Sequence, residues 1–201
     1  APRAPQAATP ADPYAGICPG NRNSGVQFVG RSTVWGANGA AATAHPRATL
    51  IGIDTLRRGG SAIDAAIAIN AALGFLEPTA NGIGGDAFCM LWDPAQRKVV
   101  GFNGSGNSPL GLSLETARSK KATDGYLPAY GAVTVNVPRT VDAWWAAHQR
   151  YGKLPWADVL LPVAVLCEEG VPMPQLIAWY LQRNMAGFDG RAAIMRAGKV
   201  V

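Results

Sequence analysis

The sequence predicts an α+β chain in which two long helices precede a short β-hairpin and further helices follow. Three observations carry this prediction. Residues 45–78 contain two helical apolar patterns, separated by a cationic, glycine-containing break. Two short apolar runs, Ala87–Trp92 and Lys98–Phe102, flank a cluster of turn-forming residues. Beyond residue 140 the apolar residues return at helical spacing.

The first helix is expected to begin at His45-Pro46 and to end at Arg57, before the Gly59-Gly60 pair. Proline is tolerated in a first helical turn, and glycine can adopt the left-handed conformation of a helix cap. We interpret His45 as a local hydrogen-bonding group rather than a catalytic base. The apolar side of this helix is expected to consist of Ala48, Leu50, Ile51, Ile53 and Leu56.

The second helix is expected to begin at Ser61, with Asp64 three positions on in a capping-box arrangement, and to stop at Pro78. Alanine and isoleucine cover most of its circumference, so it should be a core helix. Asn81–Asp86 then forms a glycine-rich turn, in which Asp86 is expected to accept hydrogen bonds from the turn's own N–H groups. A phosphate-binding interpretation is weak, because such a loop follows a strand and opens a helix, and here the order is reversed.

The two apolar runs are expected to form a hairpin, and the polar, glycine-rich stretch after it, 103–109, can present amides and hydroxyls to a ligand or simply connect two elements. Two short extended segments, Val26–Phe28 and Arg31–Trp35, are expected before the first helix. The other expected elements are a helix at Leu114–Lys121, a strand at Val133–Val137, a helix capped by Thr140 and running to Tyr151, and helices at Trp156–Glu169 and Gln175–Met185.

Composition limits the class of protein. With 201 residues, 48% of them hydrophobic, the chain suffices for a single domain, which we place at 26–201 behind a flexible leader at 1–25. The net charge of +5 is scattered, which disfavours nucleic-acid binding, and no apolar run is long enough to span a membrane. The Ala- and Pro-rich start resembles the end left by signal-peptide removal and favours a periplasmic or secreted protein, with a trimmed cytoplasmic chain as the alternative.

The three cysteines, Cys18, Cys89 and Cys167, fit neither a zinc pattern nor a disulfide framework. Cys89 and Cys167 lie in apolar stretches and are expected to be buried small hydrophobes. The aromatic residues around 144–151 are interpreted as packing residues, and His148 is interpreted in the same way.

Several motifs in matching order resemble the gamma-glutamyltransferase family. They are RRGGSAID at 57–64, NGIGGDAF at 81–88, VNVPRTVDAWW at 135–145 and YGKLPW at 151–156. The resemblance extends over about 39–174. It implies the four-layer αββα fold of N-terminal-nucleophile hydrolases, made as a precursor that cuts itself in two.

In that family the nucleophile is the N-terminal threonine of the second piece, activated by its own α-amino group. This chain begins with Ala1 and contains nothing similar to the processing-site motif. The resemblance therefore implies the first, alpha subunit of an amide hydrolase or acyltransferase, completed by a beta subunit from the same precursor. A C-terminal segment beyond Val201 is expected. No metal or organic cofactor is expected, because the threonine chemistry needs none.

The family's first subunit usually supplies an arginine-glutamate pair four and three residues before a proline. Alignment on Pro109 places Ser105 and Gly106 there, and Asn107 stands where a related branch has an arginine. We therefore predict a small amide substrate that is not gamma-glutamyl, with Asn103, Ser105 and Asn107 lining its pocket. The alternatives are a noncatalytic binding scaffold and a true gamma-glutamyltransferase or hydrolase.

Overall fold

A computed structural model describes residues 34–121, 125–128 and 131–185 of the chain. The chain divides into two units, one made of residues 41–170 and the other of the segments on either side. Helix α6, Gln175–Met185, belongs to the second unit and has the predicted bounds. The predicted leader, the extended segment at 26–28 and Cys18 lie outside the described residues.

Helix α1, Pro46–Arg57, begins and ends where the sequence predicts. The His45 ring confirms its local role, because its Nδ1 accepts the backbone N–H of Arg47 at 3.2 Å. Gly59 has φ +90°, the left-handed conformation expected of the cap. The predicted apolar side is wrong in part: the buried positions of the helix are Ala48, Gly52 and Thr55, whereas Leu50 is exposed. Small residues face α2 because the two helices approach closely.

Helix α2, Ala62–Leu76, has the predicted capping box. Ser61 Oγ accepts the Asp64 N–H at 3.1 Å, and Asp64 Oδ2 accepts the Ser61 N–H at 2.8 Å. Most of its residues from Ile63 to Leu76 are buried or half-buried, which confirms a core helix. The N-terminus of α2 is therefore fixed by reciprocal hydrogen bonds.

Strands β1, Ala87–Asp93, and β2, Lys98–Gly104, form the predicted hairpin. They pair antiparallel, with Ala87 opposite Gly104 and Asp93 opposite Lys98. This hairpin is the only sheet in the described part of the chain. Burial alternates along both strands, so that one face packs inward and the other is open.

The remaining elements correct three predictions. Helix α3 is shorter than predicted, Leu114–Ser119. The expected strand at 133–137 is absent: a 3₁₀ turn occupies Ala132–Thr134, and no strand of the described residues pairs with this segment. Helix α4, Thr140–Tyr151, has Arg139 rather than Thr140 as its N-cap. Helix α5, Trp156–Glu169, has the predicted bounds.

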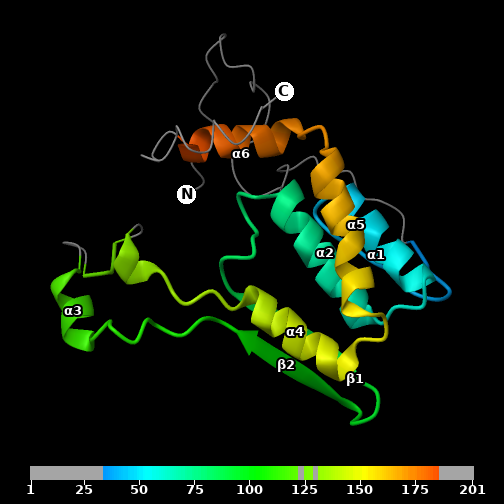
Figure 1. The fold of residues 1–201 in the computed structure, drawn as a ribbon, viewed down its shortest axis with the longest axis horizontal. Coiled ribbons are helices and arrows are strands. Elements are labelled where there is room, and N and C mark those ends of the chain that lie inside the picture. Colours follow the sequence, from blue (N-terminus) through cyan, green and yellow to red (C-terminus); the bar gives the residue numbers. More distant parts are fainter. Residues whose placement is uncertain (1–33, 122–124, 129–130, 186–201) are drawn as a thin grey trace, which may run out of the picture. The chain divides into compact units, whose positions relative to one another are not determined.

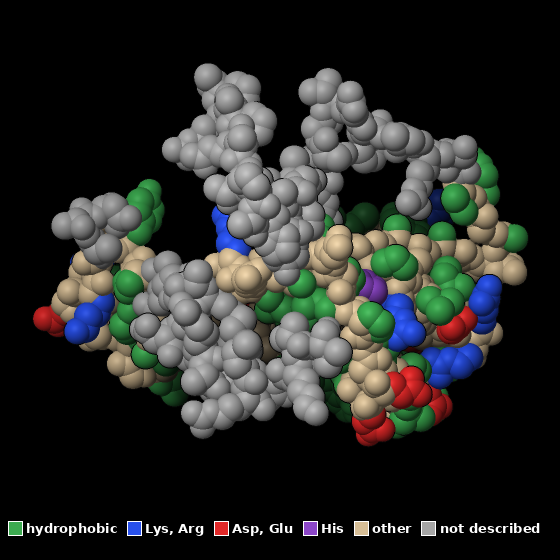
Figure 2. Space-filling view, turned by 90° about the horizontal axis from the view of Figure 1, so that it is seen from above, with side chains coloured by type: hydrophobic (Ala, Val, Ile, Leu, Met, Phe, Trp, Pro, Cys, Tyr) green, Lys and Arg blue, Asp and Glu red, His purple; other side chains and the backbone are tan. Residues whose placement is uncertain are grey.

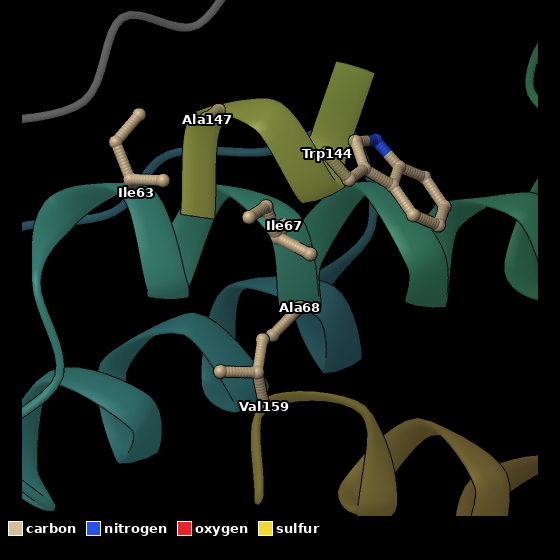
Figure 3. Packing of buried hydrophobic residues seen from close by; sticks show 6 residues of the cluster. All are labelled: Ile63, Ile67, Ala68, Trp144, Ala147 and Val159. Carbon is tan, nitrogen blue, oxygen red and sulfur yellow. The ribbon is translucent and has the colours of Figure 1, made fainter. Parts of the chain in front are cut away.

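The core of the 41–170 unit joins α2, α4 and α5. Figure 3 shows Ile63, Ile67 and Ala68 of α2 beside Trp144 and Ala147 of α4, with Val159 of α5 on the other side of α2. The inward face of the hairpin packs on this cluster through side chains of both strands. Helix α4 therefore lies between the hairpin and α2, and α1 and α5 flank α2 away from the hairpin (Figure 1).

Two further features concern the surface. Lys and Arg side chains lie among Asp and Glu side chains on the face drawn in Figure 2. None of the helices in the described ranges combines the length and hydropathy that a membrane crossing requires.

Cys89 is half-buried, as its inward position on β1 requires, but Cys167 is exposed, so the burial predicted for Cys167 is wrong. The helical repeat turns Cys167 to the outer side of α5, although its neighbour Leu166 is buried.

Candidate functional site

Three segments that are distant in sequence meet at one end of the hairpin. They are the glycine turn before β1, the loop after β2 and the entrance to α4. The backbone carbonyl of Gly85 accepts the N–H groups of Arg139 at 3.2 Å and Thr140 at 3.1 Å. These two donors belong to the first residues of α4, which have no partner within the helix. The glycine turn therefore caps α4, a role that the sequence assigned to the Thr140 side chain.

Asp86 joins the glycine turn to the loop after β2. Its Oδ1 accepts the backbone N–H of Gly106 at 3.0 Å, across twenty residues of chain. The prediction that Asp86 bonds within its own turn is therefore wrong. The hairpin is the physical reason, because it brings the beginning of β1 beside the end of β2 and so places Asp86 next to the loop.

The three predicted substrate-binding residues lie in this loop, but they have different surroundings. Asn103 is the penultimate residue of β2, on its open face, and its Oδ1 accepts the Ser105 N–H at 2.9 Å. Ser105 is half-buried and Asn107 is exposed. The loop thus carries its polar side chains on a backbone that is itself hydrogen-bonded.

The loop also packs tightly against the segment that leads into α4. The Asn107 carbonyl accepts the Val137 N–H at 3.0 Å. A Cβ atom added to Gly106 would lie 1.9 Å from the Val137 carbonyl oxygen and 3.1 Å from Asn136 Cβ. Any other residue at 106 would therefore force the two segments apart. Glycine at this position thus permits the closed path of the loop.

A cavity of about 400 Å³ lies beside this end of the hairpin, between α2, α4 and β1. Its wall is mostly apolar, with Ile63 and Ile67 on α2 and Trp144 on α4, and it reaches Asp86 and Asn70. The Asn70 side chain already has a hydrogen-bond partner, since its Oδ1 accepts the Trp144 Nε1–H at 2.9 Å. The cavity therefore offers an apolar space next to the polar loop.

A second polar cluster, which the sequence did not single out, lies at the other end of α4. The carboxylate of Asp64 is fully buried, and its Oδ2 accepts the N–H groups of Lys153 at 2.9 Å and Leu154 at 3.1 Å besides that of Ser61. His148 Nε2 lies 3.7 Å from Asp64 Oδ1 and 2.9 Å from the Leu154 carbonyl.

This cluster is structural. The His148 ring stacks on Trp145 and meets Trp156 edge-on, which confirms the packing interpretation of the aromatic residues. His148 lies eight positions after Thr140, the first residue of α4, or about 12 Å along the helix at the helical rise. The capping box was visible in the sequence, but the approach of 153–154 to the same carboxylate depends on the tertiary fold.

Two side chains of the hairpin have shifted pKa values. Asp93 closes the β1–β2 turn, and the hydrogen bond from the Gln96 N–H, with others from Tyr151 and Ala95, lowers its pKa despite burial. Burial raises the pKa of the Cys89 thiol, so this cysteine is a poor nucleophile. Within the described ranges no three His, Cys, Asp or Glu side chains gather as a metal site.

Comparisons with known proteins identify the relatives of this fold. A family model described as Gamma-glutamyltranspeptidase matches residues 48–199. The glutathione hydrolase-like YwrD proenzyme of Bacillus subtilis is 33% identical over 154 residues, which cover 76% of this chain and 29% of that protein.

Two solved structures are also similar. Helicobacter pylori gamma-glutamyltranspeptidase has a TM-score of 0.70 and 28% identity, over 78% of this chain and 45% of that one. The cephalosporin acylase from Bacillus halodurans has a TM-score of 0.62 and 39% identity, over 77% of this chain and 30% of that one. The chain thus spans less than half the length of each of these relatives. Their folds confirm the predicted α+β class.

Proposed function

Because the chain belongs to the gamma-glutamyltranspeptidase family of hydrolases and transferases, we propose that it forms the alpha-subunit part of a self-processed amide hydrolase or acyltransferase whose acyl group is not gamma-glutamyl. Residues 26–201 would belong to one domain that a second chain completes. The observation that carries the proposal is the loop after β2. By the resemblance, Ser105 and Gly106 stand there in place of the family's arginine-glutamate pair, and Asn107 stands in place of the arginine of a related branch.

The open face of the hairpin supports the proposal that a second chain completes the domain. Phe88, Met90 and Trp92 are 70%, 80% and 59% exposed, and Val99 of β2 joins them on the same face. A contiguous apolar sheet face of this kind marks an interaction surface, and an isolated two-stranded hairpin is only marginally stable. The occupant that fits is the inner sheet of a beta subunit made from the same precursor. The word proenzyme in the name of the Bacillus subtilis relative agrees with such processing.

The chemistry would take place on the partner. The hydroxyl of an N-terminal threonine attacks the amide carbonyl, while its α-amino group, whose ordinary pKa is near neutrality, takes the hydroxyl proton. The amine of the substrate leaves with that proton, and the acyl group remains as an ester of threonine. Water then hydrolyses the ester, or a second amine accepts the acyl group. This chain contributes the scaffold and one wall of the acyl pocket.

We place Asn103, Ser105 and Asn107 in that wall. An arginine binds a carboxylate through two charge-assisted hydrogen bonds, whereas serine and asparagine offer neutral bonds about half as strong. The loss of the arginine weakens carboxylate recognition by roughly 1.5–3 kcal/mol, or one to two orders of magnitude. The 39% identity to a cephalosporin acylase supports an acyl group of another kind.

The direct test is intact-mass analysis and N-terminal sequencing of the protein expressed from its full precursor. We expect a companion chain that begins with threonine and a sample that hydrolyses acyl amides. If no companion chain forms, or if it begins with a residue that carries no hydroxyl or thiol, the catalytic proposal is wrong and the binding-scaffold alternative takes its place.

A second test concerns the acyl group. Ser105→Arg restores the cation of the clamp, so kcat/KM for a gamma-glutamyl anilide should rise about tenfold or more. Ser108→Arg is the matched control, because it adds the same charge to the same loop three positions away and should give no such gain. An absent gain from Ser105→Arg would count against the pocket. A wild-type enzyme that already prefers gamma-glutamyl substrates would favour a true gamma-glutamyltransferase.

A further inference from the structure

We propose that Asp86 determines acyl specificity in this enzyme. Its carboxylate holds the loop after β2 through Gly106, and its negative charge makes the acyl pocket select neutral or cationic acyl groups against anionic ones. The proposal rests on the function proposed above and adds a positioning residue and a substrate class to it.

The positioning role follows from the hydrogen bonds of the loop backbone. The Ser105 N–H donates to Asn103 Oδ1 and the Gly106 N–H donates to Asp86 Oδ1, while the Asn107 carbonyl accepts the Val137 N–H. The bonds at 103 and 137 fix the two ends of the loop, and the bond to Asp86 at 3.0 Å fixes its middle. Asp86 itself is immobilised at its backbone, because the preceding carbonyl of Gly85 accepts two N–H groups from the start of α4.

The same geometry leaves several side-chain polar atoms of the loop without a partner in the described part of the structure, so that they can contact a substrate. Among the residues that the structure describes, Asp86 Oδ2, Ser105 Oγ and the Asn107 side chain have no hydrogen-bond or ion-pair partner. Asp86 and Asn107 are exposed and Ser105 is half-buried, so a bound molecule can reach these side chains while the loop backbone stays fixed. The free carboxylate oxygen gives that binding surface a negative charge.

No Lys, Arg or His of the described residues forms an ion pair with Asp86. Arg139 is the one cationic residue in the segments that meet here, 81–86, 103–109 and 135–140, and its guanidinium lies 3.5 Å from the carboxylate of Asp142. A carboxylate beside neutral hydroxyl and amide groups attracts ammonium groups and repels carboxylates. A glutamate at 106 would require the loop to move, because its Cβ atom would lie 1.9 Å from the Val137 carbonyl oxygen.

The test uses the two-chain enzyme processed from its full precursor and three anilides of matched length: 4-aminobutyryl, pentanoyl and glutaryl p-nitroanilide. We expect the wild type to favour the cationic over the anionic substrate by at least about tenfold in kcat/KM, with the neutral one between them. Asp86→Asn keeps an oxygen acceptor for the Gly106 N–H but removes the charge, and should lower that ratio about tenfold. Glu115→Gln, which removes an exposed carboxylate from α3, is the control and should leave the ratio unchanged.

Comparison of Asp86→Ala with Asp86→Asn separates the effect of the hydrogen bond that holds the loop from the effect of the negative charge. The Ala variant removes the acceptor as well, so KM should rise for all three anilides and the Gly106 amide should exchange its hydrogen at least about tenfold faster than in Asp86→Asn. An Asp86→Asn enzyme with the wild-type ratio overturns the specificity role, and equal Gly106 exchange in the Asn and Ala variants overturns the positioning role. If the wild type hydrolyses no anilide, the proposed function fails and the specificity role falls with it, whereas hydrogen exchange still decides the positioning role.

Discussion

The buried carboxylate of Asp64 gives the sharpest stability prediction. Its Oδ2 accepts three backbone N–H groups, from Ser61 at 2.8 Å, Lys153 at 2.9 Å and Leu154 at 3.1 Å, and the residue has no exposed surface. It therefore links the start of α2 to the connection between α4 and α5. Asp64→Ala removes the acceptor and leaves all three donors without it.

The magnitude follows from the number and kind of these bonds. A hydrogen bond to a charged group contributes about 1.5–3 kcal/mol, and a buried donor that loses its partner costs about 1–3 kcal/mol. The three bonds share one oxygen, and the connection at 153–154 can relax toward water, so their sum overstates the effect. We expect Asp64→Ala to lower the free energy of unfolding by about 3–5 kcal/mol.

Asp54→Ala is the matched control. Asp54 lies on neighbouring α1 and pairs with Arg57 at 3.1 Å, with side chains 53% and 72% exposed. An exposed pair of this kind contributes about 0–1 kcal/mol. Urea denaturation of the assembled protein gives both values, and hydrogen exchange at the amides of 153 and 154 gives the local effect. A cost below 1 kcal/mol for Asp64→Ala, or unchanged exchange at these two amides, would refute the reasoning.

Three further predictions follow from single contacts. Pro162 has no N–H to donate to the Asp158 carbonyl, which instead accepts a hydrogen bond from Arg58 Nη1 at 3.0 Å. Arg58→Ala should lower the free energy of unfolding by about 1 kcal/mol, and by less when Pro162→Ala supplies the helical N–H. A double-mutant cycle measured by urea denaturation tests this. The pKa of Asp93 is lowered in the fold, so its stabilisation is present above about pH 4 and is lost as the pH falls through the folded pKa. The stability gap between wild type and Asp93→Asn should therefore close in acid, and a gap that stays constant would contradict this. Met90→Glu, on the open hairpin face, should reduce recovery of the two-chain protein on size-exclusion chromatography without preventing synthesis of the precursor; full recovery would argue against a partner on this face.

The helices were predictable because their signals are local. Periodicity and caps placed α1, α2, α5 and α6 within a residue or two, since a capping serine or a glycine after the last turn acts within a few residues. The hairpin was predictable for the same reason, as two apolar runs flank a short turn. The strand expected at 133–137 failed because its alternating Val and Thr residues find no neighbouring strand in the described structure.

The site was only partly predictable. The polar loop and its neutral residues could be read from the sequence, but the role of Asn103, Ser105 and Asn107 in substrate binding stays a prediction. So do the leader at 1–25 and the periplasmic or secreted location. The assignment of Asp86 to its own turn was wrong, because no sequence pattern reveals that Gly106 lies beside it.

By itself the sequence determined the family and the order of most elements, because each depends on residue identities at fixed short spacings, whereas the absence of the charged clamp stays a prediction. Only the tertiary structure decided which distant segments meet. The hairpin brings Asp86 to Gly106, α4 begins on the carbonyl of Gly85, and Asp64 receives donors from residues 153 and 154. Such contacts form because buried N–H groups must find acceptors wherever the packed elements place them, and that placement results from packing over the whole domain.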